Sequence, residues 1–173
     1  SIGYDGVQVV LPYYHTPSEE GMYQHYKMLS DVVGPDFGVM VYNNPAVSGS
    51  WIKPALMKRI SKLPQVIAVK ENNPDIRKVK AIYDAVDPED MQVIEGLGEP
   101  MYSFAFVFGV RGFVSSLANI APLLCYSLYE AAMEDDLAGV REAIERIDRL
   151  FSLRTKANER HGPTTAIAGS RSY

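Results

Sequence analysis

Two short apolar runs in the sequence each end on a side chain that can do chemistry. The run 66–70 (VIAVK) ends on the amine of Lys70, and the earlier run 39–42 (VMVY) ends on the phenol of Tyr42. Apolar, β-branched runs of this length are typical of strands buried on both faces, and in parallel α/β folds the carboxyl ends of the strands carry the chemistry. An amine and a phenol at two strand ends point to covalent imine chemistry on a carbonyl substrate.

The elements that would position this pair alternate between strand and helix along the chain. The apolar pattern predicts strands at 7–11, 39–42, 66–70, 91–95 and 112–116. It predicts helices at 18–33, 54–62, 75–86 and 100–108, two further helices after residue 116, and an irregular tail over 160–173. Strands separated by helices indicate a parallel sheet, but the pattern does not separate an open doubly wound sheet from a β/α barrel.

Bulk properties of the chain exclude several classes of protein. Its 173 residues, 47% of them hydrophobic, can bury one sizeable core, and the net charge of −4 argues against nucleic acid and anionic membranes as partners. No apolar run approaches the roughly 20 residues of a membrane span, and we expect a cytoplasmic location. The single cysteine, Cys125, excludes an internal disulfide and is expected to be buried and inert.

Nucleotide and metal sites are also disfavoured by the sequence. The stretch Gly96-Leu97-Gly98 lacks the third glycine of a dinucleotide fingerprint, and the chain has no Gly-Lys-Ser/Thr phosphate loop. The three histidines show no metal-ligand spacing. We therefore expect neither a cofactor nor a metal ion.

Four motifs, in this order, carry a specific resemblance to a known family. They are the segment 12–26 (PYYHTPSEEGMYQHY), the loop 42–49 (YNNPAVSG), the strand end 69–71 (VKE) and the segment 109–119, with GFVS inside it. Together they resemble the dihydrodipicolinate synthase/N-acetylneuraminate lyase family over roughly residues 3 to 150.

The resemblance implies a (β/α)8 TIM barrel of which this chain supplies strands four to eight. Residues 1–119 would form the partial barrel, and residues 120–173 would form C-terminal helices and a tail in the same domain. Five strands cannot close an eight-stranded barrel, and they would leave bare edges and an exposed inner face. We therefore expect either a fragment of a longer chain or a piece that is stable only in association.

The resemblance also implies a class I lyase reaction without a cofactor. Lys70 would form an imine with a 2-keto acid, Tyr42 would shuttle protons, and Gly96 and Val114 would border the imine. A second tyrosine from a neighbouring subunit and a pair of threonines would lie in the absent N-terminal part. The family usually forms tetramers of tight dimers. Without this context, a strand-end lysine is more often a snorkelling surface cation, and Gly96 and Val114 could be turn and core residues.

Two departures from the family pattern bear on the substrate. Val47 stands where dihydrodipicolinate synthases usually carry an arginine for a substrate carboxylate, and an apolar residue there removes those donors. Asn72, after the lysine, could hydrogen-bond a polyhydroxylated substrate, although an Asn-Pro turn explains the loop equally well. The first hypothesis is an aldolase or dehydratase acting on pyruvate, a 2-keto-3-deoxy sugar acid or a similar keto acid. The alternatives are a dihydrodipicolinate synthase condensing pyruvate with aspartate semialdehyde, and a non-catalytic binding or assembly protein.

Overall fold

The computed structural model describes residues 3–161, and its centre is a four-stranded parallel sheet. The strands are β1 (Gly6–Val10), β2 (Gly38–Asn43), β3 (Val66–Glu71) and β4 (Gln92–Glu95), and they lie side by side in chain order. Strand order that follows chain order leaves the outer edge of β1 without a partner strand among the described residues. This is the arrangement of a β/α barrel segment that has not closed.

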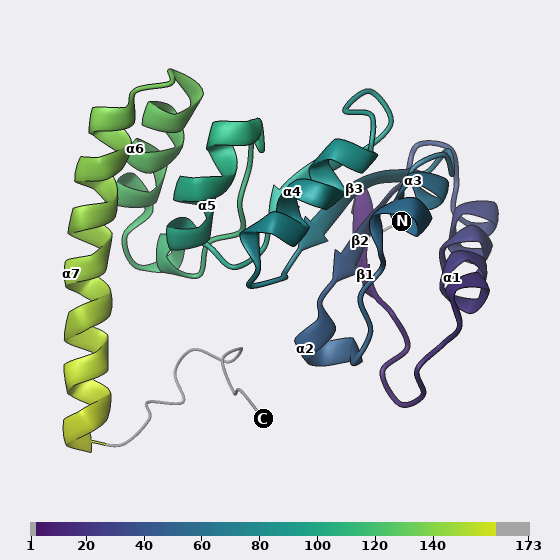
Figure 1. Cartoon of the computed structure of the whole chain (residues 1–173), viewed down its shortest axis with the longest axis horizontal. Coiled ribbons are helices and arrows are strands. Elements are labelled where there is room, and N and C mark those ends of the chain that lie inside the picture. The colour runs from purple at the N-terminus through teal and green to yellow at the C-terminus, as the bar shows by residue number, and fades with distance from the viewer. Residues whose placement is uncertain (1–2, 162–173) are drawn as a thin grey trace.

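Helices connect the strands and continue beyond the sheet (Figure 1). Those between the strands are α1 (Glu19–Val32), α2 (Pro45–Ser48), α3 (Pro54–Ile60) and α4 (Ile76–Ala85). After β4 come α5 (Glu99–Ala105), η1 (Phe106–Phe108), η2 (Leu117–Asn119), α6 (Pro122–Met133) and α7 (Leu137–His161). Ser18 caps α1, because its side chain accepts a hydrogen bond from the Gly21 N–H at 3.1 Å.

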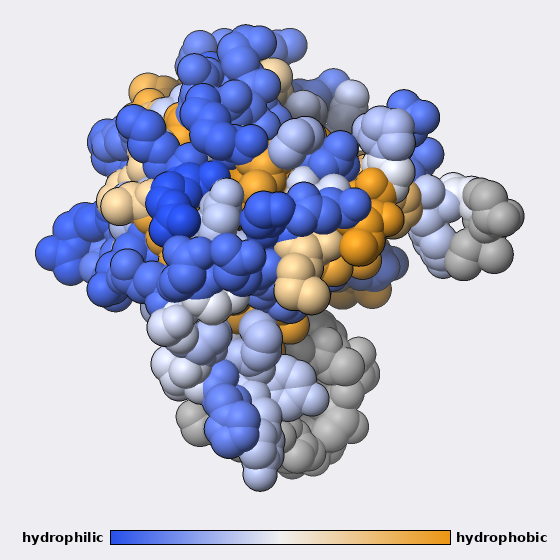
Figure 2. All heavy atoms as spheres, turned by 90° about the vertical axis from the view of Figure 1, so that its right-hand side faces the viewer, coloured by the Kyte–Doolittle hydropathy of each residue, from blue (hydrophilic) through white to orange (hydrophobic). Residues whose placement is uncertain are grey.

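The helices cover one face of the sheet and leave the other open. Val39, Val41 and Val69 are fully buried in one cluster with side chains of α3 and α4. The residues that alternate with the two valines of β2, such as Met40, point to the opposite face. Ile67 joins this face at the register shift between β2 and β3, where it is 54% exposed and borders an open cavity of about 340 Å³. The outer surface on the α1 side is mostly hydrophilic, as expected for helices that turn their polar side to water (Figure 2).

The predicted strand at 112–116 is wrong in extent. Only an isolated parallel bridge joins Phe113 to Glu95, supported by two backbone hydrogen bonds of 2.9 Å. Two residues after this bridge, the side chain of Ser115 accepts a hydrogen bond from the Ala118 N–H at 2.8 Å and starts a local turn toward η2. Such side-chain contacts offer the backbone an alternative to a strand ladder, and the segment takes it.

Three other expectations need correction. The loop 43–49 contains the short helix α2, and α7 extends through His161, so the first two residues of the predicted irregular tail are helical; residues 162–173 lie outside the described part. We would expect one of Tyr13 and Tyr14 to pack, yet both are exposed, at 73% and 85%.

No helix in the described range 3–161 has the length and apolarity to cross a membrane.

Cys125 lies in the core, as expected. It lies on α6 and is 4% exposed, and its Sγ donates a hydrogen bond to Glu99 Oε1 at 3.3 Å. Burial raises the pKa of this thiol above its ordinary value, which disfavours the reactive thiolate.

Candidate active site

Lys70 and Tyr42 lie beside each other at the carboxyl ends of β3 and β2. The two residues are register partners, so their side chains leave the sheet on the same open face. The Lys70 Nζ lies 4.4 Å from the centroid of the Tyr42 ring, a distance at which the ring face attracts an ammonium group. Within residues 3–161 this nitrogen makes no hydrogen bond or ion pair. The amine is therefore held in position by a ring face and not engaged by a carboxylate.

The phenol oxygen of Tyr42 accepts one hydrogen bond. Its donor is the side-chain amide Nδ2 of Asn44, at 2.8 Å. Asn44 is 7% exposed, and its Oδ1 accepts from the Ala46 N–H at 3.1 Å, which caps α2. The phenol is thus hydrogen-bonded to the residue that caps α2.

A layer of buried polar side chains lies directly behind this pair. Asn43, Glu71 and Glu95 are register partners on β2, β3 and β4, and all three are fully buried on the helix-covered face. Glu71 Oε2 accepts from Asn43 Nδ2 at 2.6 Å and from the indole N–H of Trp51 at 3.4 Å. Desolvation outweighs these hydrogen bonds and raises the pKa of Glu71 to about 7.

Glu95 is buried like Glu71, and the charge of Lys70 also acts on its carboxyl group. Its two carboxylate oxygens accept from the backbone N–H of Leu97, each at 2.9 Å. Burial raises the pKa of Glu95 to about 7; hydrogen bonds from the backbone of residues 96–98 oppose this rise, and the positive charge of Lys70 opposes it to a smaller extent. The site therefore combines one lysine amine, one phenol and two buried carboxyl groups that change charge near neutral pH.

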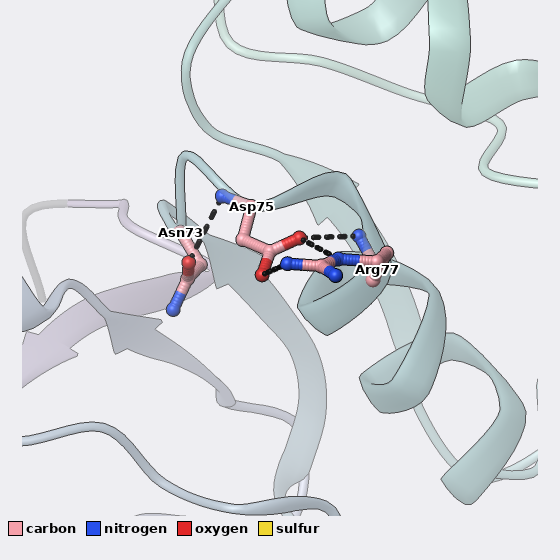
Figure 3. Close-up of polar contacts among 3 residues, drawn as sticks. All are labelled: Asn73, Asp75 and Arg77. Carbon is pink, nitrogen blue, oxygen red and sulfur yellow. Dashed lines mark hydrogen bonds and ion pairs between the residues drawn. The ribbon is translucent and has the colours of Figure 1, made fainter.

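The loop after Lys70 is shaped by its own side chains. Asn73 Oδ1 accepts from the Asp75 N–H at 3.1 Å, and Asp75 Oδ1 accepts from the Arg77 N–H at 3.0 Å to cap α4 (Figure 3). The Arg77 guanidinium also binds Asp75 and holds the pKa of that carboxyl below its ordinary value. The side chain of Asn73 thus stabilises the Asn-Pro turn that leads into α4.

The four residues predicted to bind substrate do not form one cluster in the structure. Gly96 and Asn72 are in contact, because a Cβ on Gly96 would lie 1.8 Å from Asn72 Oδ1, which is itself buried without a hydrogen-bond partner. Val114 is 40% exposed and borders the open-face cavity together with Ile67. Val47 is 53% exposed on α2 and is linked to the pair through Asn44, whose carbonyl accepts the Val47 N–H at 3.2 Å.

Sequence reasoning missed the side chains that support the pair. Asn43 and Asn44 are both part of the YNNP motif. Nothing in their spacing predicts that the Asn44 amide donates to the Tyr42 phenol and the Asn43 amide to Glu71. The Trp51 indole reaches Glu71 from twenty positions away in the chain, which no local pattern reveals. Among residues 3–161, no group of three or more His, Cys, Asp or Glu side chains is arranged to hold a metal ion.

Comparison with known proteins assigns the chain to a family. The sequence profile of the Dihydrodipicolinate synthetase family matches residues 1–166. The chain belongs to the dihydrodipicolinate synthetase family. The 4-hydroxy-tetrahydrodipicolinate synthase of Methanospirillum hungatei is 35% identical over 153 residues, which cover 87% of this chain and 50% of that protein. The enzyme of the same name from Nitrobacter hamburgensis is 36% identical over 137 residues, covering 79% and 45%.

Solved structures of this family match the fold. Dihydrodipicolinate synthase from Thermotoga maritima superposes with a TM-score of 0.80 at 32% identity, covering 87% of this chain and 51% of that one. The Aquifex aeolicus enzyme gives 0.79 at 28% identity, covering 87% and 50%. The chain spans about half the length of the relatives it matches. The coarser form of the predicted fold, a partial α/β barrel of the dihydrodipicolinate synthetase family, agrees with these matches.

Proposed function

We propose that this chain forms the lysine-bearing part of a Schiff-base lyase that condenses pyruvate with aspartate semialdehyde. The observation that carries the proposal is the register pairing of Lys70 with Tyr42, in which the amine makes no hydrogen bond or ion pair within the described residues. The relatives from Methanospirillum and Nitrobacter are named 4-hydroxy-tetrahydrodipicolinate synthase, which favours this reaction over sugar-acid cleavage. The sequence alone ranks these two reactions in the opposite order.

The proposed chemistry begins at the lysine. The neutral amine of Lys70 attacks the ketone carbon of pyruvate, and the carbonyl oxygen takes the phenolic proton of Tyr42. Loss of that oxygen as water leaves a protonated imine, and removal of a proton from the neighbouring methyl carbon gives an enamine. The enamine carbon attacks the aldehyde of the second substrate, and water then hydrolyses the imine to release the product and restore the amine. Tyr42 is the group positioned to pass protons in each of these steps.

The remaining predicted residues are assigned to the substrate side of the imine. Asn72 and Gly96 would border it beyond β3 and β4, Val114 would close the open face, and Val47 would approach the second substrate. We also propose that residues 1–119 are the partial barrel and 120–173 its C-terminal helices and tail. Further strands would cover the free edge of β1 and the open face. The assembled protein would be a cytoplasmic homo-oligomer.

One observation favours a second candidate function. The side chain of Val47 has no donor for a substrate carboxylate, whereas the resemblance leads us to expect an arginine there. A 2-keto-3-deoxy sugar acid aldolase or dehydratase would not need that arginine. The two reactions share the Lys70 imine and differ in the second substrate, so a panel of aldehydes and sugar acids separates them.

Borohydride trapping tests the shared chemistry. Pyruvate followed by borohydride should add the mass of one reduced pyruvyl group to the natural protein, and Lys70→Arg should abolish the addition. Lys78→Arg is the matched control, because the Lys78 Nζ also lies over an aromatic ring, at 5.0 Å from the Trp51 centroid. If the protein takes up no pyruvyl group, the lyase proposal is wrong and a binding or assembly role is the hypothesis that is left.

A further inference from the structure

The buried amide of Asn44 has an orientation that its surroundings fix. Its Oδ1 accepts from the Ala46 N–H at 3.1 Å, and only the oxygen end of an amide can accept a hydrogen bond from a backbone N–H. The NH2 end must therefore be the one that faces the Tyr42 phenol, at 2.8 Å. The usual ambiguity between the two ends of an asparagine side chain does not arise at this position.

This orientation decides what the phenol can do. A tyrosine hydroxyl has one O–H donor and two lone pairs, and Asn44 occupies one lone pair. Its hydrogen bond leaves the phenolic proton unclaimed by the α2 side of the site. An acceptor in the same place would instead take that proton and hold it away from the ring's other neighbours. The register pairing of Tyr42 with Lys70 sets those neighbours on the open face of the sheet.

We propose that Asn44 is a positioning residue that keeps the Tyr42 proton available to the reacting oxygen at Lys70. The inference rests on the proposed function, because it assigns a partner to the proton shuttle of that reaction. The Asn44 side chain hydrogen-bonds Tyr42 and Ala46 and not the Lys70 amine, so it would act through the phenol.

A role in helix capping alone does not explain this residue. The N-cap of α2 needs only a side-chain oxygen, and serine and aspartate cap helices about as well as asparagine. The NH2 group at the phenol is the part that capping leaves unexplained. Asn44→Ser and Asn44→Asp both retain a capping oxygen, so both variants should fold, and they differ in what they present to Tyr42.

The test measures how fast pyruvate becomes trapped as an imine in the natural protein. Asn44→Ser shortens the side chain, so that it keeps a capping oxygen but places no donor at the phenol. It should slow imine formation about fivefold, the worth of one ordinary hydrogen bond, without changing the half-saturating pyruvate concentration. Asn44→Asp replaces the donor by an acceptor that binds the phenolic proton. It should slow imine formation about 10²-fold, the lower end of the contribution of a positioned acid.

A double-mutant cycle with Tyr42→Phe separates positioning from capping and from simple charge repulsion. If Asn44 acts through the phenol, Asn44→Asp should cost less than about twofold once the hydroxyl is gone. A loss of equal size in both backgrounds would overturn the inference, because Asn44 would then act on the fold or on pyruvate directly. Normal trapping in Asn44→Asp with Tyr42 present would overturn it as well. If the unmodified protein forms no adduct, the proposed function fails first and the inference fails with it.

Discussion

Replacing Glu71 by glutamine tests the electrostatics of the buried layer behind the lysine. In Glu71→Gln, the amide oxygen can take the place of Oε2 and keep the hydrogen bonds from Asn43 and Trp51. The amide nitrogen then occupies the position of Oε1, which is buried and has no hydrogen-bond partner. The exchange removes the titratable proton and keeps the shape, so its effect on stability should depend on pH.

The magnitude follows from the pKa of Glu71. Burial raises this pKa from an ordinary value of 4.5 to about 7, which corresponds to about 3 kcal/mol of folding free energy. The folded chain holds the proton more tightly than the unfolded chain, so the carboxyl costs nothing below pH 4.5. Its cost grows as the pH rises from 4.5 to about 7 and is complete above that range. Glu95 adds a similar slope, but it is present in both proteins and cancels in their difference.

Urea unfolding measures the difference directly. Trp51 is the only tryptophan of the sequence and donates to Glu71, so its fluorescence reports on this part of the fold. The free energy of unfolding of Glu71→Gln minus that of the parent should rise by about 3 kcal/mol between pH 4.5 and pH 8. The unpaired amide nitrogen adds a constant offset and leaves the slope unchanged. A difference that stays flat across this range would show that Glu71 ionises at its ordinary pKa in the folded protein, and the reasoning from burial would be refuted.

Three further substitutions test single features of the structure. Tyr102→Phe removes a buried hydroxyl without a hydrogen-bond partner, so the free energy of unfolding should stay level or rise by about 1 kcal/mol; a loss of that size would reveal a hidden partner. Gly96→Ala places a Cβ 1.8 Å from Asn72 Oδ1, and thermal unfolding should show a loss of about 1–3 kcal/mol; unchanged stability would mean that the contact is loose. Ser18→Ala removes the cap of α1 and should cost about 1 kcal/mol in urea unfolding, whereas Ser18→Asp, which keeps a capping oxygen, should cost little.

The sequence predicts most of the strands and helices because their patterns are strong and local. The apolar runs ending at Tyr42 and Lys70 appear as β2 and β3, each within a residue of the expected end. Helix α2 is not predictable in this way, since four residues carry no periodicity and the helix depends on the Asn44 cap. The prediction of a strand at 112–116 is wrong because a local side-chain contact intervenes: after a single bridge, Ser115 turns the chain toward η2.

The candidate site is predictable only in its most reactive part. Lys70 and Tyr42 follow from strand ends and motif order, but the sequence leaves open whether Glu71 orients the pocket or pairs with a surface cation. In the structure Glu71 is buried beside its register partner Asn43 and accepts a hydrogen bond from it, so it does not pair with a surface cation. The proposed substrate shows the same limit. Val47 alone leads to a sugar acid as the first hypothesis, whereas the relative from Methanospirillum, which matches 87% of the chain, is named a synthase.

The most direct test of the central claim is to locate the adduct that pyruvate and borohydride leave on the natural protein. Peptide mapping by mass spectrometry should find the reduced pyruvyl group on the Nζ of Lys70, with Lys78 and the other lysines unmodified. An adduct on another lysine, or none after saturating pyruvate, would contradict the assignment of Lys70 as the imine-forming residue.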